Sequence, residues 1–187
     1  MKLVKLIIFL FFLTSLNCFA VSNYGVYSYQ DNKIDAVKNA REHNALGNIY
    51  FQEKNYIAAL REYEIAYNLS YQNNLSATYL YNIARCYMTL GRYETAKNAL
   101  LGVIRKDCMN ITYYDSLVDC FIKLKTDKKE LKNYLKDSIN PYNKIVAGLI
   151  YMKTGNKRAA KTLFDEFITN NPDMLITSDI KRILKKL

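Results

Sequence analysis

The sequence predicts an all-α protein of about four helical pairs and a closing helix, and three observations carry this prediction. Apolar residues recur at spacings of three and four, as in Leu80, Ile83, Ala84 and Tyr87. No stretch alternates polar and apolar residues as a half-buried strand does. Gly and Pro, which usually interrupt helices, number only 6 and 2 among 187 residues. Long uninterrupted helices are therefore expected.

Residues 1–20 are set apart from the fold because they have the pattern of a secretory signal. Lys2 and Lys5 form a basic start, and a continuous apolar run (LIIFLFFL) follows over residues 6–13. A membrane-spanning helix needs about 20 apolar residues, and this run ends well before that. We therefore expect an exported protein that is in the periplasm or associated with the cell envelope.

Three fates of this segment remain open. Cleavage after Ala20 gives a soluble chain that begins at Val21, because Cys18 and Ala20 are small residues at the positions that a signal peptidase reads. Alternatively, residues 16–18 (LNC) loosely resemble the lipobox of bacterial lipoproteins, which predicts a lipid on Cys18. The third alternative is an uncleaved anchor.

The chain is basic, and its charge limits the classes of partner that we expect it to bind. Its formal charge of +10 falls to +8 when Lys2 and Lys5 leave with the signal. An exported chain meets little nucleic acid, so we expect none as a partner. Acidic proteins, anionic lipid or cell-wall polymers are the alternatives. The sequence does not predict the oligomeric state.

The organising feature is a segment that occurs four times, with starting points 37, 34 and 30 residues apart. Each copy has a small residue, an aromatic three residues later, an alanine twelve later and a large apolar residue sixteen later. In order, these are Gly47, Tyr50, Ala59 and Tyr63; Ala84, Tyr87, Ala96 and Leu100; Val118, Phe121, Glu130 and Tyr134; Gly148, Tyr151, Ala160 and Phe164. Glu130 departs from the pattern, so the third copy is the degenerate one.

This pattern resembles the tetratricopeptide repeat (TPR), whose positions run W-x2-L-G-x2-Y, then A-x3-F, then P over about 34 residues. In the first copy His43 stands at the Trp position and Tyr71 at the Pro position, so both depart from the family. The resemblance implies a right-handed solenoid of helical hairpins. Small residues would let the paired helices approach closely, and aromatic residues would fill the space between pairs.

The remaining elements follow in order along the chain. Residues 21–38 are polar and lack periodicity, which predicts a tether, with the first helix starting near Ala36 and the repeat domain spanning 39–187. Residues 70–76 (SYQNNLS) predict a longer loop, and 126–138 a trimmed second helix in the third pair. Pro141 suits a first helical position. Residues 176–187 predict a capping helix that starts near Ser178 or Asp179.

The residues that carry chemistry are few, so no enzymatic activity and no cofactor is predicted. His43 is the only histidine, and the sequence contains neither a phosphate-binding loop nor a zinc-protease motif. Cys86, Cys108 and Cys120 match no zinc spacing, and no metal site is predicted. They are either small residues packed inside helices or include one disulfide, for which Cys108 with Cys120 is the first candidate.

Two surfaces are candidates for binding. The densest basic patch, Lys123, Lys125, Lys128, Lys129 and Lys132, is either a solvated face or a docking surface for an acidic partner or anionic lipid. The resemblance implies a second surface, a groove lined by the first helices of successive pairs. Its predicted residues are Asn44, Asn48, Phe51, Gln52, Tyr81, Asn82, Arg85 and Met88.

Asn48 and Asn82 coincide with the two asparagines of the carboxylate clamp by which some family members hold a peptide C-terminus. The cationic residues of that clamp are absent here, although Arg41 or Arg85 could substitute for them. Together, the signal and the resemblance imply a non-catalytic protein-protein interaction scaffold of the bacterial cell envelope. The alternatives are a lipoprotein of an outer-membrane assembly complex, a structural part of an envelope machine such as a spirochaete flagellar collar, or a regulatory module of a cell-wall enzyme.

Overall fold

The computed structural model describes residues 29–70, 75–137 and 139–187. The predicted signal, both cleavage sites and Cys18 lie outside these residues. By its contacts the chain divides into residues 1–38 and residues 39–187. None of the described helices is long and apolar enough to cross a membrane.

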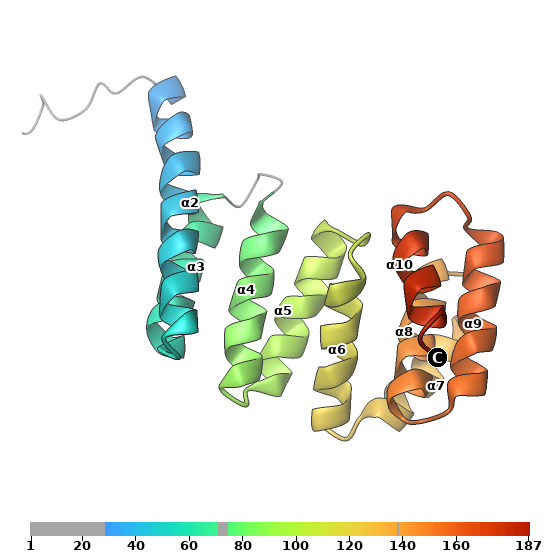
Figure 1. Cartoon of the computed structure of the whole chain (residues 1–187). Helices are drawn as coiled ribbons and strands as arrows, with labels where there is room; N and C mark the ends of the chain where they lie inside the picture. Colours follow the sequence, from blue (N-terminus) through green and yellow to red (C-terminus); the bar gives the residue numbers. More distant parts are fainter. Residues whose placement is uncertain (1–28, 71–74, 138) are drawn as a thin grey trace, which may run out of the picture. The chain divides into compact units, whose positions relative to one another are not determined.

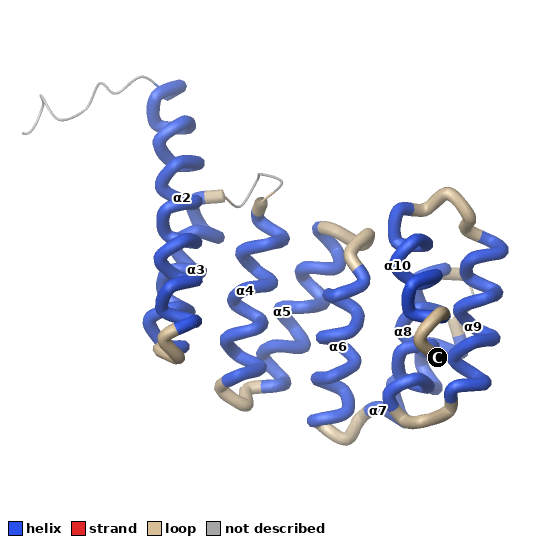
Figure 2. The backbone as a smooth tube through the Cα atoms, in the orientation of Figure 1, coloured by secondary structure: helices blue, strands red, loops and turns tan. Residues whose placement is uncertain are grey.

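The described residues form nine helices and no strand, which confirms the all-α fold (Figure 2). Their bounds are α2 Tyr29–Gln52, α3 Tyr56–Leu69, α4 Ser76–Thr89, α5 Tyr93–Lys106, α6 Ile111–Lys123, α7 Asp127–Lys136, α8 Pro141–Lys153, α9 Lys157–Asn170 and α10 Leu175–Leu184. From α3 to α10 each helix contacts the next one in the chain (Figure 1). The predicted solenoid of four pairs, α2–α3, α4–α5, α6–α7 and α8–α9, with a closing helix is therefore confirmed.

One turn geometry recurs inside all four pairs. Lys54, Gly91, Lys125 and Gly155 each follow a first helix with a positive φ, between 58° and 90°. The next residue's N–H donates to the carbonyl of the repeat's aromatic residue: Asn55 to Tyr50, Arg92 to Tyr87, Thr126 to Phe121 and Asn156 to Tyr151, at 2.8–2.9 Å. These bonds close a Schellman motif, which satisfies carbonyls left open at a helix end. The degenerate third copy makes the same turn as the others.

Within a pair, the small residue brings the two helices together. A Cβ placed on Gly47 would lie 2.7 Å from the Tyr63 ring, and one on Gly148 would fall well inside contact with the Phe164 ring. Both aromatic side chains are buried. The spacing of sixteen residues seen in the sequence is therefore a direct contact between paired helices.

The structure corrects two predicted helix starts and confirms two other features. α2 begins at Tyr29, so the predicted start near Ala36 is wrong and residues 29–38 are helical. α10 begins at Leu175 after Met174, and Ser178 donates back to the Leu175 carbonyl from inside the helix, so the predicted caps are wrong. α7 is short, at 10 residues, and Pro141 opens α8, both as predicted.

Of the two alternatives for the cysteines, the disulfide between Cys108 and Cys120 is absent from the structure, because both thiols are free. Cys108 precedes the first turn of α6 and Cys120 lies near its end. A rise of 1.5 Å per residue separates them by roughly 14 Å, whereas a disulfide needs Cα atoms about 4.4–6.8 Å apart. The Cys108 thiol donates instead to the Tyr142 hydroxyl at 3.2 Å, and Cys86 and Cys120 are buried among apolar side chains.

The closing helix covers more than the last pair. α10 contacts α9, beside which it lies in Figure 1, and it also contacts α6 of the third pair. Ile176 and Ile180 are fully buried, and they share one apolar cluster with Ile145 and Leu149 of α8. In α8 every residue from Ile145 to Ile150 is buried, so that helix is enclosed on all sides. This placement determines how much of the predicted groove stays open.

Candidate functional site

The predicted groove can be followed repeat by repeat at two positions of each first helix, three residues before and one residue after the small residue. We call these the inner-face positions. They hold Asn44 and Asn48 in α2, Tyr81 and Arg85 in α4, Asp115 and Asp119 in α6, and Ile145 and Leu149 in α8. Their chemistry changes from amide and cationic, through acidic, to aliphatic along the array.

In the first two repeats, predicted groove residues from α2 and α4 bind one another. The Asn82 amide donates to the Asn44 side-chain oxygen at 2.8 Å, and Arg85 donates to the Asn82 oxygen at 3.3 Å. The Arg85 guanidinium also lies over the Phe51 ring, 4.5 Å from its centroid. Asn82 is buried, and the other three are half-buried. We call these four residues the Arg85 cluster.

Two further predicted groove residues, Asn48 and Tyr81, have structural roles. Asn48 is exposed, but its oxygen accepts a 2.8 Å hydrogen bond from the Tyr63 hydroxyl. Tyr63 is buried, and that burial raises its pKa to about 12. The Tyr81 hydroxyl is 3.1 Å from the Ser116 hydroxyl, and its ring lies 4.9 Å from that of Tyr113, so Tyr81 joins the second repeat to the third.

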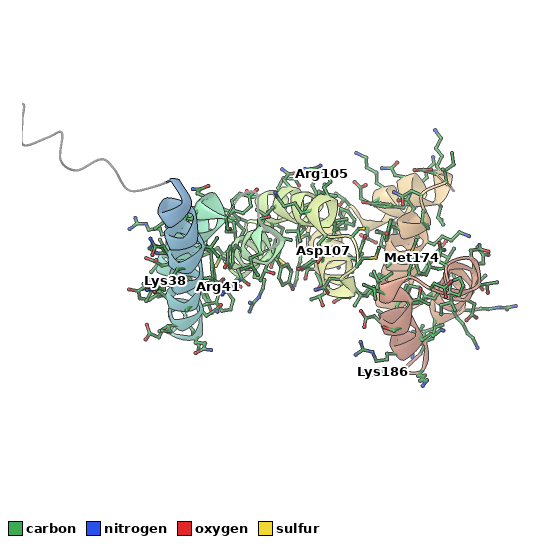
Figure 3. All side chains as sticks on the ribbon, turned by 90° about the horizontal axis from the view of Figure 1, so that it is seen from above. Lys38, Arg41, Arg105, Asp107, Met174 and Lys186 are labelled. Atoms are coloured by element: carbon green, nitrogen blue, oxygen red, sulfur yellow. The ribbon has the colours of Figure 1, made fainter. Side chains whose placement is uncertain are left out.

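The other two predicted groove residues, Gln52 and Met88, and the second candidate cation, Arg41, are not members of the Arg85 cluster. Gln52 is exposed at the end of α2, and Met88 is half-buried at the edge of the main apolar cluster. Arg41 is exposed on the side of α2 near α4 (Figure 3). Its charge partly offsets the effect of burial, which raises the pKa of Tyr79 in α4. A second cation therefore lies on the α2 side that faces α4.

In the third repeat, an ion-pair cluster occupies the inner face, and sequence reasoning missed it. Lys153, at the end of α8, is 2.8 Å from Asp115 and 2.6 Å from Asp119. Burial alone would lower the pKa of Lys153, but the hydrogen bonds and charges of the two aspartates outweigh it and raise that pKa. The sequence could have pointed to this cluster, because Asp115, Asp119 and Lys153 all occupy groove positions when the repeats are aligned.

In the fourth repeat, the inner face is closed. Ile145 and Leu149 are buried in the cluster that contains Ile176 and Ile180 of α10. The open part of the inner face is therefore confined to the first three repeats. Within it, the third repeat's carboxylates are already paired with a lysine. The Arg85 cluster is the part that offers a fixed cation.

The predicted basic patch lies elsewhere, on the end of α6, the following turn and α7. Its five lysines, Lys123, Lys125, Lys128, Lys129 and Lys132, are all exposed. The helix α7 that carries three of them has no buried residue. Among the described residues, none of the five takes part in an ion pair. The structure thus presents them as an exposed basic surface.

Sequence reasoning also missed an open depression of about 460 Å³ between α7, α8 and α9. Leu135, Tyr151 and Leu163 line it, with Arg158 at its edge. It forms beside α7, which has four residues fewer than α5 or α9 and buries no side chain. The spacing of the repeats predicted the shorter α7, but it did not predict the depression beside that helix.

Comparison with known proteins supports the same architecture. Two segments match family models of the tetratricopeptide repeat, residues 77–105 over most of α4 and α5, and residues 147–173 over part of α8 and all of α9. No curated protein matches the sequence.

Solved structures share the fold at low sequence identity. A tetratricopeptide repeat protein from Parabacteroides merdae is 18% identical over 80% of this chain, with a TM-score of 0.52. This chain spans 60% of that protein's length. PilF of Pseudomonas aeruginosa is 14% identical over 77% of this chain and 66% of its own, with a TM-score of 0.49. The Arabidopsis OM64 TPR domain is 16% identical over 81% of this chain and 98% of its own, with a TM-score of 0.44.

The Parabacteroides merdae structure indicates the fold alone, and the family rests on the repeats themselves. Two of the four helical pairs match the family's models, and all four close with the same turn. The chain is a tetratricopeptide repeat protein.

Proposed function

We propose that this chain is a non-catalytic adaptor of the bacterial cell envelope, which binds a segment of a partner protein at the Arg85 cluster. Tetratricopeptide repeats bind protein partners and are generally non-catalytic scaffolds. The only histidine, His43, is 2.6 Å from the Glu62 carboxylate, a pairing of two half-buried residues across the first helical pair. Its geometry supports a structural role for His43.

The observation that carries the binding site is the position of Arg85. Its planar guanidinium is stacked on Phe51, and Asn82 accepts from one nitrogen, so its side chain is ordered before a ligand arrives. An arginine has five N–H donors, and this bond uses one. A preordered, half-desolvated cation suits a carboxylate or a carbonyl of an extended peptide, because less side-chain entropy is lost on binding.

The neighbouring groups indicate which ligand fits. The Phe51 ring is half-buried and offers an apolar contact beside the cation. Arg41 adds positive charge on the α2 side that faces α4. We therefore propose an acidic peptide segment with an apolar or aromatic side chain next to its carboxylate. In the third repeat, the Asp115 and Asp119 carboxylates would repel such a segment, which favours binding toward α2.

The envelope location rests on the basic start and the apolar run of residues 1–20. Release after Ala20 gives a soluble adaptor, and a lipid on Cys18 gives a membrane-associated one. Either form leaves the Arg85 cluster unchanged.

The test compares Arg85→Ala with a control variant, Arg92→Ala. Arg92 is an exposed arginine in the turn between α4 and α5. Partners are cross-linked in the envelope fraction, identified by mass spectrometry and purified, and their affinity is then measured. Truncating an interface arginine typically costs about 2 kcal/mol, so Arg85→Ala should weaken binding at least about tenfold while Arg92→Ala does not. Tyr81→Ala is unsuitable, because it would also loosen α4 from α6.

A second pair of variants locates the partner if the cluster is not the site. Charge reversal at Lys128 and Lys129 should change mainly the salt dependence and the association rate. Normal binding by Arg85→Ala together with lost binding by the lysine variant would place the partner on the basic patch and refute the proposed site.

A further inference from the structure

The exposed side of α7 carries a row of lysines. Lys128, Lys132 and Lys136 follow one another at spacings of four residues, so they lie on one side of the helix. All three are exposed, and we call them the α7 stripe. The helix is held through its other side, where Leu131 and Tyr134 are half-buried against the main apolar cluster. The stripe therefore takes no part in packing.

The matching positions of the other second helices hold no such row of cations. In order along each helix, they are occupied by Ile57, Arg61 and Ile65 in α3; Glu94, Asn98 and Gly102 in α5; and Arg158, Thr162 and Glu166 in α9. Each of those helices has at most one cation at these positions, whereas α7 has three. The stripe is therefore a property of the third repeat and is not required by the fold.

The acidic side chains of this region are fewer than the lysines and less exposed. Residues 123–137 contain six lysines and three carboxylates, a formal excess of three positive charges. Asp127 and Glu130 are half-buried at the start of α7. The Asp137 carboxylate, at the end of the helix, accepts a 3.0 Å hydrogen bond from the Asn143 amide. The side of α7 that faces solvent is therefore basic.

Exposed apolar side chains adjoin the α7 stripe. Leu135 is 45% exposed, and it lies on the same side of the helix as Lys128, seven residues earlier. Ile139 is 92% exposed in the turn after α7, more than any other large apolar side chain of the described residues. Its N–H donates to the Asp137 carboxylate at 3.1 Å, which holds it close to the helix end. Leu135 also lines the depression of about 460 Å³, together with Leu163 of α9.

We propose that the α7 stripe docks on the surface of an anionic lipid bilayer, with Leu135 and Ile139 entering the interface beside the headgroups. Clusters of roughly four to eight lysines or arginines bind the phosphates of anionic lipids, and residues 123–136 supply six lysines. Apolar side chains add to such binding in proportion to the area that they bury. A bilayer offers both negative charge and an apolar layer, whereas the surface of an acidic protein offers chiefly charge.

Docking through α7 leaves the proposed peptide site available. The Arg85 cluster is built by α2 and α4 of the first two pairs, whereas α7 is the second helix of the third pair. The chain would then hold its partner at a membrane surface, with or without a lipid on Cys18. One acyl chain alone gives weak, reversible membrane binding, so the stripe would supply the second contact that stable anchoring needs.

The test is binding to lipid vesicles. The form to use is the processed chain that begins at Val21, because it carries no lipid of its own. It is mixed with vesicles that contain phosphatidylglycerol, which is anionic, or with vesicles of phosphatidylcholine alone, and the bound fraction is measured by sedimentation. We expect binding to the anionic vesicles only. This binding should be lost as the salt concentration rises from about 0.05 to about 0.5 M, because salt screens the lysines.

A pair of lysine variants locates the contact. Lys132→Gln with Lys136→Gln should weaken binding to the anionic vesicles roughly thirtyfold, since each lysine near such a surface contributes about fivefold. The matched control is Lys181→Gln with Lys185→Gln. It removes the same charge at the same spacing from exposed positions at the end of α10, and it should leave the affinity within about twofold of wild type.

An apolar variant separates a bilayer from a purely charged partner. Ile139→Ser should weaken binding to the anionic vesicles about fivefold or more without changing its salt dependence, because it removes apolar contact and no charge. Leu175→Ser, at a 77% exposed site on α10, is the control. If a variant fails to fold, a fluorophore on Ile139→Cys in a Cys108→Ser chain decides. Its emission should shift to the blue on anionic vesicles, and that of Leu175→Cys should not.

Three results would overturn the proposal: no preference for anionic vesicles, an equal loss of binding in the α10 control pair, or an Ile139→Ser variant that binds like wild type. Binding to soluble polyglutamate as tight as to vesicles, and unaffected by Ile139→Ser, would indicate an acidic protein instead. Arg85→Ala should bind vesicles like wild type, so failure of the membrane contact is distinct from failure of the peptide site.

Discussion

At the scale of single residues, small side chains decide how closely the helices of a pair approach. Gly148 lies against the Phe164 ring and Gly47 against the Tyr63 ring. Gly102 differs, because a Cβ there would meet only the flexible end of Leu80, at 3.2 Å. Alanine is therefore expected to have opposite effects on stability at positions 148 and 102.

Gly148→Ala should lower the free energy of unfolding by about 1–3 kcal/mol, because the added methyl group overpacks a buried contact. Gly102→Ala is the matched control and should be neutral or stabilising by up to about 1 kcal/mol, since alanine favours the helix. Urea denaturation measures both. Equal effects of the two variants would show that the close contact is not what requires glycine at position 148.

The three cysteines among the described residues, Cys86, Cys108 and Cys120, show how context separates residues of one type. Burial raises the pKa of the Cys86 and Cys120 thiols to about 11, so both are neutral and enclosed at neutral pH. Cys108 is half-buried and bonded to Tyr142 near the surface. Sequence spacing suggested Cys108 with Cys120 as partners, but α6 holds them a helix length apart.

Labelling with iodoacetamide should therefore modify Cys108 first in the folded protein and all three cysteines after denaturation, as read by peptide mass spectrometry. Raised thiol pKa values favour the folded state below the usual value of 9.0, and this contribution is lost as the pH rises toward about 11. Stability should accordingly fall across that range, and less so in Cys86→Ala. A Cys108–Cys120 peptide in the native digest would contradict the structure.

At the scale of elements, the turn and the closing helix explain how an irregular array holds together. Lys54 and Lys125 adopt the left-handed conformation that Gly91 and Gly155 adopt in the other two pairs. The backbone bonds of the turn thus persist where the sequence pattern weakens. The closing helix α10 covers the apolar inner side of the fourth repeat.

Removing residues 177–187 should expose Ile145 and Leu149 and cause aggregation, because these side chains are buried only while α10 is in place. Ile180→Glu tests the same contact without truncation, since an unpaired charge at a buried site typically costs about 3 kcal/mol or more. Leu175→Glu, on the exposed side of α10, is the control. Light scattering and thermal melting should separate them, and a truncated chain that stays monomeric and equally stable would remove the capping role from α10.

At the scale of the whole molecule, export decides which partners the chain meets. The basic start and apolar run predict a processed chain outside the cytoplasm. Cell fractionation should find the protein in the envelope or periplasm. Mass spectrometry should show either a start at Val21 or a lipid on Cys18. A full-length chain in the cytoplasm would refute this prediction and return nucleic acid to the list of partners for a chain of charge +10.

The sequence by itself determined the features that depend on local spacing. Periodicity of three and four predicted helices, and the small-aromatic-alanine pattern predicted four pairs, the shortened α7 and the opening of α8 at Pro141. Such features follow from residues close in the chain, so they can be read without a structure. The groove register also placed Phe51, Asn82 and Arg85 on helices that prove to be neighbours.

Only the tertiary structure decided which groups on each surface remain available for binding. Lys153 pairs with Asp115 and Asp119 from 34 or more residues away, and Tyr81 joins the second repeat to the third. α10 folds back to α6 and closes the fourth inner face, while Leu46 and Ile49 stay open although their counterparts are buried. Burial and charge compensation depend on the partner that a residue meets in space, and spacing along the chain does not contain that information.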